Sequence, residues 1–185
     1  MIVTDLPSFL EIEGKRFEIK TDFRDIIKIF SEISDEKLND IEKIYIILDK
    51  LFLNSEIFGV EDIFSAFKKA KWFLDGGKDY SENSKDTPKI FDWEQDFDFI
   101  ISAVDQSVKT VETVLDLKYM HWWTFLRKLS ERKDTRLDSI ITIRDKLNRH
   151  EKLDEFERRI LSENHDLIFI KNNEMKKFEE EMWGV

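Results

Sequence analysis

The sequence contains no cysteine in its 185 residues. That absence excludes disulfide bonds, thiolate metal sites and cysteine nucleophiles, and it fits a reducing compartment, where disulfides are rare. Glycine and proline are also scarce, with five and two residues, which is too few for a β-protein with many tight turns. We therefore expect a mainly α-helical fold.

Long apolar runs are missing as well. No stretch approaches the ~20 apolar residues that a membrane span requires. The first seven residues include Asp5 and lack the basic start and apolar stretch of a signal peptide. We therefore expect a cytoplasmic protein that does not associate with a membrane.

Apolar and aromatic side chains are abundant: 41% of the residues are hydrophobic and 16 are Phe. A chain of this length buries roughly two thirds of its unfolded surface, so it can build a hydrophobic core without disulfide bonds or structural metal ions. We expect a single helical domain over residues 1–185, with about six to eight helices.

Residue spacing predicts a small N-terminal β-hairpin followed by an N-terminal and a C-terminal helical region. The hairpin covers about residues 8–20, where apolar and charged residues alternate on both sides of Gly14. Apolar spacing of three and four residues then predicts the helices. The N-terminal helical region covers 22–75, with helices over about 23–33, 35–53 and 60–74. The C-terminal helical region covers 92–183, with helices over about 92–104, 117–130 and 135–147, and one or two more from Leu153 to Trp183.

Local signals mark several of these boundaries. Asp22 offers an N-cap oxygen to the first helix, and Gly76 and Gly77 end the third. Residues 76–90 gather Gly, Ser, Asn, Asp and Pro and are predicted to form a flexible loop. Asp92 and Gln95 have the spacing of a capping box.

The net charge of −10 opposes binding to nucleic acid, because phosphate contacts depend on Lys and Arg. The charge is uneven: residues 118–159 hold 12 basic and 8 acidic residues, net +4, and the remainder holds 18 and 32, net −14. That stretch is either a local basic surface or ordinary solvated charge, and the second is the more common case.

No pattern predicts catalysis, a metal site or a cofactor. None of the histidines has a second His or Cys one helical turn away; they are His121, His150 and His165. An acidic cluster lacks the glycine and the terminal glutamate of a calcium loop, so we expect it to cap a helix and face solvent; it comprises Asp92, Glu94, Asp96 and Asp98. Phosphate-loop and nucleophile-elbow patterns are absent. We therefore expect a protein that is not an enzyme.

The segment YMHWWTFL, residues 119–126, is the most unusual. On a helix Trp122 and Trp123 point about 100° apart, so they cannot share one narrow stripe. Either both belong to a wide buried face, or one enters the core while the other, with His121, marks an interface, where Trp is enriched. A stacking platform for nucleic acid beside Arg127 is disfavoured by the overall acidity. The candidates for a protein interface are His121, Trp122, Trp123, Arg127 and Trp93.

Five short motifs follow one another along the chain. They are TDFR (21–24), DWEQD (92–96), YMHWWTF (119–125), IR (143–144) and KLDEFE (152–157). In this order and spacing they resemble the bacteriophage family known as phage gene product fifteen, found in tailed phages and prophages of Gram-positive bacteria. The resemblance covers nearly the whole chain and brings no catalytic residues with it.

The resemblance implies a gene in the tail module and a non-enzymatic role in tail morphogenesis. Proteins encoded there are commonly tail assembly chaperones, which keep the tape-measure protein soluble until tube subunits polymerise around it. We therefore expect the tape-measure protein, the tail-tube protein or both as partners in the host cytoplasm, with self-association left open. The alternatives are a minor structural protein kept in the virion, and a phage regulator or inhibitor that binds a host protein.

Overall fold

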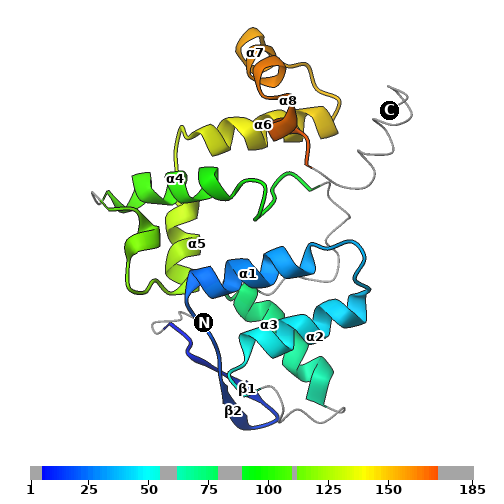
Figure 1. Cartoon of the computed structure of the whole chain (residues 1–185), viewed down its shortest axis with the longest axis vertical. Coiled ribbons are helices and arrows are strands. Elements are labelled where there is room, and N and C mark those ends of the chain that lie inside the picture. Colours follow the sequence, from blue (N-terminus) through cyan, green and yellow to red (C-terminus); the bar gives the residue numbers. More distant parts are fainter. Residues whose placement is uncertain (1–5, 55–61, 79–88, 110–111, 171–185) are drawn as a thin grey trace. The chain divides into compact units, whose positions relative to one another are not determined.

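The computed structural model describes residues 6–54, 62–78, 89–109 and 112–170. Over these residues the chain is mainly helical, with eight α-helices and one two-stranded antiparallel hairpin (Figure 1), which confirms the predicted fold class. The elements are β1 (Phe9–Ile12), β2 (Lys15–Glu18), α1 (Phe23–Ile33), α2 (Asp40–Leu51), α3 (Ile63–Leu74), α4 (Phe97–Val108), the 3-10 turn η3 (Val114–Asp116), α5 (Trp122–Ser130), α6 (Arg136–Asn148), α7 (Glu155–Glu163) and α8 (His165–Ile168).

The hairpin forms where the alternating pattern predicted it. Glu13 and Gly14 both have positive φ, 48° and 76°, as a tight two-residue hairpin turn requires. Leu10 and Ile12 on β1 are buried, whereas their charged neighbours are exposed. After β2, Ile19 forms an antiparallel bridge with Phe52 directly after α2, so the hairpin is held against the helices.

The chain divides into two compact units, which are described separately. Unit 1 comprises residues 1–83 and 116–130, and unit 2 comprises residues 84–115 and 131–185. Unit 1 therefore contains the hairpin, α1–α3 and α5, and unit 2 contains α4 and α6–α8. The sequence-based division placed residues 117–130 in the C-terminal helical region, but they belong to unit 1 because α5 packs against α1. The prediction of a single domain over 1–185 stays a prediction.

The core of unit 1 is built from aromatic side chains of α1, α3 and α5. Phe23, Phe73, Trp122 and Phe125 are completely buried. Phe23 of α1 stacks on Phe125 of α5 with ring centroids 4.4 Å apart and planes 5° from parallel. Figure 1 shows α1, α2 and α3 side by side, with the hairpin next to them.

The core of unit 2 joins α4, α6 and α8. Ile140 and Ile143 of α6 pack with Ile168 of α8, each at most 1% exposed. Partly buried residues surround this cluster; they are Phe99, Leu147, Leu153, Ile160 and Leu161. Thr135 begins α6 with a capping box to Asp138, close to the predicted boundary.

Three predicted helices, α2, α4 and α5, begin about five residues later than expected. The helix predicted over 35–53 is α2, which begins at Asp40 because Asn39 and Glu42 form a capping box there. The helix predicted over 117–130 is α5, which begins at Trp122. Residues 117–121 are not helical, because they pair with the segment before α1, where Asp22 and His121 form an antiparallel bridge.

The helix predicted over 92–104 is α4, which begins at Phe97 and continues to Val108. Residues 93–96 form a turn instead, and Lys109 ends the helix in the left-handed conformation, with φ of 57°. The predicted start of the third helix at Val60, most of the 76–90 loop and the tail beyond Ile170 lie outside the described residues. Over the residues that are described, no helix is long and apolar enough to cross a membrane.

Candidate functional site

In unit 1 the TDFR and YMHWWTF motifs meet directly. The backbone N–H of Phe23 donates to the carbonyl of Met120 at 3.0 Å, and the N–H of Trp122 donates to the carbonyl of Thr21 at 2.7 Å. The Thr21 hydroxyl also lies 2.8 Å from the Tyr119 hydroxyl. Two motifs almost a hundred residues apart therefore form one short antiparallel pairing that joins α1 to α5.

Asp22 and Arg24 hold this pairing together. The guanidinium of Arg24 binds both carboxylate oxygens of Asp22 at 2.7 Å and donates to the carbonyls of Leu117 and Lys118 at 2.8 and 3.1 Å. Burial would raise the pKa of Asp22, but hydrogen bonds from Arg24 and from the Met120 N–H outweigh that effect and lower it. The ionised carboxylate thus orders residues 117–120 through Arg24.

His121 is the N-cap of α5. Its Nδ1 accepts a hydrogen bond from the N–H of Trp123 at 3.0 Å, and the other ring nitrogen lies 3.0 Å from the carbonyl of Pro7. Because Nδ1 accepts, the proton of the neutral ring is on Nε2 and is donated to Pro7. Burial lowers the pKa of His121, and the bond to Pro7 opposes this only partly. His121 is thus a neutral structural residue that is 5% exposed.

The two adjacent tryptophans bind the C-terminus of α3. The indole N–H of Trp122 donates to the carbonyl of Leu74 at 2.9 Å, and that of Trp123 donates to the carbonyl of Phe73 at 2.8 Å. The last carbonyls of a helix have no partner within the helix. The side chains that point about 100° apart on α5 therefore satisfy two consecutive carbonyls of α3.

Gly77 provides the space for Trp123. A Cβ atom at Gly77 would lie 2.7 Å from the ring of Trp123, and the residue has φ of +80°. Gly76 and Gly77 were predicted only to end a helix, which they do after Leu74. Nothing in the spacing of the sequence indicated that Gly77 also contacts a tryptophan 46 positions further along the chain.

The five predicted interface residues differ in accessibility. His121 and Trp122 are buried inside unit 1. Burial of Trp122 agrees with both interpretations of the tryptophan pair, because each places at least one tryptophan in the core. Trp123 is half-buried and Arg127 is exposed, one turn apart on α5. Trp93 belongs to unit 2, where it is half-buried and packs edge-on against Phe91 at 4.8 Å. The other four residues belong to unit 1, and the role of all five in an interface stays a prediction.

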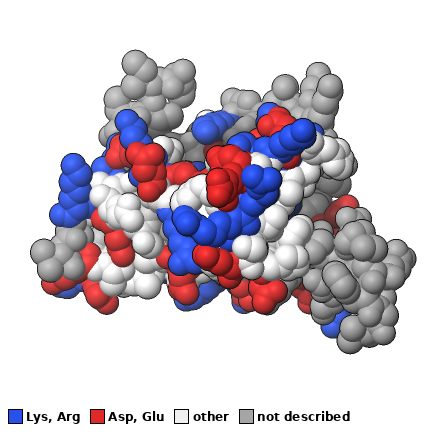
Figure 2. Space-filling model, turned by 90° about the horizontal axis from the view of Figure 1, so that it is seen from above, with Lys and Arg blue, Asp and Glu red and all other residues white. Residues whose placement is uncertain are grey.

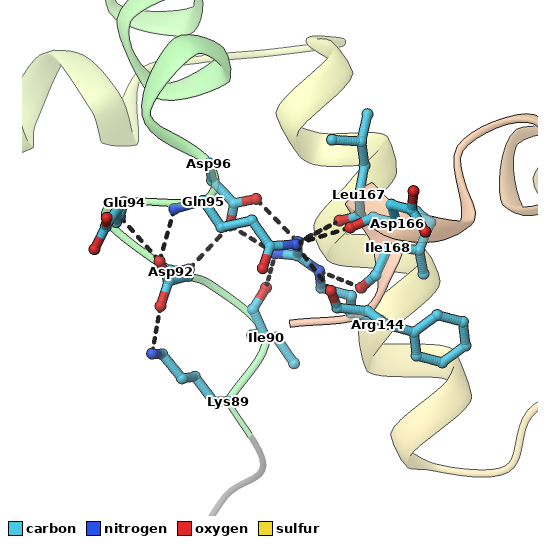
Figure 3. A network of polar contacts seen from close by, with 11 residues as sticks. Lys89, Ile90, Asp92, Glu94, Gln95, Asp96, Arg144, Asp166, Leu167 and Ile168 are labelled. Atoms are coloured by element: carbon cyan, nitrogen blue, oxygen red, sulfur yellow. Dashed lines mark hydrogen bonds and ion pairs between the residues drawn. The ribbon is translucent and has the colours of Figure 1, made fainter. Parts of the chain in front are cut away.

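In unit 2 the DWEQD and IR motifs meet in a buried ion pair (Figure 3). Arg144 of α6 binds both carboxylate oxygens of Asp96, at 2.6 and 2.9 Å, and the two side chains are 4% and 1% exposed. The guanidinium also donates to the carbonyls of Ile90 and Ile168, at 3.2 and 2.7 Å. The expectation that the acidic cluster faces solvent is wrong for Asp96, which is buried because Arg144 neutralises it.

The predicted capping box of Asp92 and Gln95 is half correct. Asp92 accepts from the N–H groups of Glu94 and Gln95, but its own N–H donates to the carboxylate of Asp96 at 2.9 Å. The side-chain amide of Gln95 instead donates to the carbonyl of Phe169 at 2.9 Å, and to those of Asp166 and Leu167 at 3.3 Å (Figure 3). Gln95 and Arg144 together hold the segment around α8 against the start of α4.

In unit 2 several cations of the basic stretch over residues 118–159 form ion pairs. These pairs include Arg132–Asp138, Arg144–Asp96, Lys146–Glu157 and Arg149–Asp145. Figure 2 shows Lys and Arg side chains mixed with Asp and Glu on the face in view. This arrangement favours ordinary surface charge over a basic binding surface. Over the described residues no group of three His, Cys, Asp or Glu side chains is placed to hold a metal ion.

Several large apolar side chains of unit 1 remain exposed. Phe64 on α3 is 78% exposed and Ile41 on α2 is 67% exposed, and Tyr45 and Tyr119 are each 55% exposed. Asp22, Arg24, Asp96 and Arg144 thus bind groups of their own unit, whereas several large apolar side chains are exposed.

The sequence profile of a family described as Bacteriophage Gp15 protein matches residues 2–167. The match therefore includes all five motifs. No curated protein and no solved structure matches the chain.

Proposed function

The chain belongs to the Bacteriophage Gp15 protein family, and on that premise we propose that it is a non-enzymatic tail assembly chaperone. In this proposal it binds the tape-measure protein, the tail-tube protein or both in the cytoplasm of the host bacterium. It keeps its partner soluble until the tail tube polymerises, and it is absent from the finished virion.

One observation supports this proposal most strongly: polar residues of the motifs make internal contacts, while several large apolar side chains are exposed. Asp22, Arg24, Asp96 and Arg144 all bind groups of their own unit. In contrast, Phe64 is 78% exposed. Exposed aromatic side chains are typical of surfaces that bind other proteins.

The charge of the chain also suits a chaperone. A long amphipathic protein that is held before assembly tends to aggregate through its apolar face. A helix-binding surface on the chaperone would cover that face, and a net charge of −10 would help the complex to stay soluble.

The proposal is tested by tagging the chain in a phage-producing host and identifying by mass spectrometry what co-purifies before lysis. We expect the tape-measure or tail-tube protein in the eluate and no tagged chain in purified virions. An unrelated acidic protein with the same tag is the control for non-specific capture.

The two alternatives give different results in the same experiment. Recovery of the chain in virions at a fixed ratio to tube subunits would make it a minor structural protein. Capture of a host protein alone, without a tail protein, would make it a regulator or inhibitor. Either result would refute the chaperone proposal.

A further inference from the structure

One face of α3 combines aromatic and cationic side chains and points away from the core of unit 1. Residues four, seven and eight positions apart lie on the same side of a helix. We call the set Phe64, Lys68, Lys71 and Trp72 the α3 stripe. The opposite side of the helix, with Ala66, Ala70 and Phe73, is completely buried. Phe64, Lys68 and Lys71 are exposed, and Trp72 is half-buried.

The charge of α3 is opposite to that of the whole chain. The helix contains three lysines and no acidic residue, although the chain has a net charge of −10. Among the described residues, Lys68 and Lys69 have no ion-pair partner, and Lys71 lies 3.4 Å from Asp75 at the end of the helix. The stripe thus presents positive charge that the described residues neutralise only at one end.

The α3 stripe continues onto α5. The ring of Trp72 lies edge-on to that of Trp123, with centroids 5.2 Å apart. Trp123 is fixed by its hydrogen bond to Phe73 and by its contact with Gly77. Arg127 follows one turn later on α5 and is exposed. An apolar group therefore lies at each end of α3, with lysines between them.

We propose that the α3 stripe, extended by Trp123 and Arg127, is a docking surface for an acidic amphipathic helix of the tail protein that the chain chaperones. The inference rests on the proposed function for the source of that helix. The residue types of the partner helix follow from the stripe itself. Lysines between two aromatic groups on α3 are complementary to carboxylates between two apolar residues on the partner.

The spacing of the stripe defines the partner further. Phe64 and Trp72 are eight residues apart, which corresponds to about 12 Å along the helix axis. A partner helix lying along α3 would present apolar residues seven or eight positions apart to these two groups, and Asp or Glu near the middle to Lys68 and Lys71. A nucleic acid would meet the same lysines, but the acidity of the chain opposes it.

The surface is tested with overlapping 30-residue synthetic peptides that cover the tape-measure and tail-tube proteins of the same phage. Binding to the full chain is measured by fluorescence anisotropy, with a DNA oligonucleotide as a further probe. We expect the peptides that bind to be acidic and amphipathic, and the oligonucleotide not to bind. Tighter binding of the oligonucleotide than of any peptide would overturn the proposal.

Two matched pairs of variants locate the surface. Lys68→Glu reverses a charge on the stripe, and Lys69→Glu makes the same change about 100° away around α3. We expect Lys68→Glu to weaken binding about tenfold or more, because it creates like-charge contacts, and Lys69→Glu to have less than about a twofold effect. Phe64→Ser should weaken binding by roughly tenfold or more, and Ile41→Ser, at a similarly exposed position on α2, should not.

The outcomes separate this inference from the proposed function. Equal affinities of the Lys68→Glu and Lys69→Glu variants, with the wild-type chain still binding a tail protein, would refute the docking surface and leave the chaperone role standing. If the wild-type chain binds neither the peptides nor the intact tail proteins, both proposals are wrong. Circular dichroism checks that each variant keeps its helices. We expect all four variants to stay folded, because the replaced side chains lie on the surface.

Discussion

Replacing Arg144 by methionine removes one partner of the buried ion pair in unit 2 and leaves the other in place. Asp96, 1% exposed, would lose two charge-assisted hydrogen bonds, and the carbonyls of Ile90 and Ile168 would lose a donor each. Breaking a buried pair from one side costs about 3–5 kcal/mol. Because the free energy of unfolding of small domains is about 5–15 kcal/mol, we expect Arg144→Met to remove roughly a fifth or more of the stability of unit 2.

Arg149→Met is the matched control on the same helix. Arg149 pairs with Asp145 one turn away, but the two side chains are 65% and 39% exposed. Such surface pairs contribute about 0–1 kcal/mol. Urea denaturation followed by circular dichroism measures the free energy of unfolding of both variants, and amide hydrogen exchange measures the local stability of their helices. Arg144→Met should lower the protection of α6 and α8 amides strongly, and Arg149→Met should leave it almost unchanged.

A double variant separates loss of charge pairing from loss of packing. Asp96→Leu combined with Arg144→Met removes both charges, and an apolar replacement of a buried pair is often tolerated. We expect the double variant to regain some of the lost stability, but not all, because the carbonyls of Ile90 and Ile168 still lack their donor. The reasoning is refuted if Arg144→Met lies within about 1 kcal/mol of Arg149→Met, or if the double variant is less stable than Arg144→Met alone.

Two further predictions concern unit 1. Gly77→Ala should destabilise the protein by about 1–3 kcal/mol more than Gly14→Ala in thermal or urea unfolding, because both glycines have positive φ but only Gly77 has the Trp123 ring within 2.7 Å of the added Cβ; equal losses would show that the ring moves freely. The lowered pKa of His121 means that the unfolded chain takes up its proton first as pH falls below about 6.5. The neutral His121 ring therefore contributes to folding stability above that pH. This contribution is lost as the pH falls below it, by at most about 1.4 kcal/mol per pH unit. His121→Asn keeps a side-chain cap and should flatten the stability profile between about pH 6.5 and 5; an unchanged slope would contradict the assignment.

Elements with a strong local signal could be predicted from the sequence. The hairpin has an alternating pattern and a glycine at its turn, and α1 has the N-cap Asp22 directly before its apolar face. The end of α3 was predicted from Gly76 and Gly77, and the start of α6 is close to the prediction at Thr135. In each case the residues that determine the boundary are neighbours in the chain, so their spacing contains the information.

Features that depend on distant residues could not be predicted from spacing. Residues 117–121 look helical by apolar content, but they pair with Thr21 and Phe23, about a hundred residues earlier. Asp96 looks like a solvated acid because its partner Arg144 is 48 positions away. The resemblance to the phage family pointed at these residues as motifs, and the structure shows that the motifs are partners within each unit.

The candidate site was only partly predictable. The adjacent tryptophans were recognised as unusual, but their hydrogen bonds to the end of α3 depend on how α3 and α5 pack. The α3 stripe was missed because Phe64 and Trp72 are as apolar as the core residues of α3, and only their exposure in the structure distinguishes the two faces of the helix.

The central claim, that the chain is a chaperone for a tail protein, is tested most directly by co-expression. The tape-measure protein of the same phage is produced in a bacterial host alone, with the chain, and with the Phe64→Ser variant, and its soluble fraction is measured after centrifugation. The account predicts an insoluble tape-measure protein on its own, a soluble one with the wild-type chain, and an intermediate result with the variant. If the tape-measure protein is equally insoluble, or equally soluble, with and without the chain, the claim is contradicted.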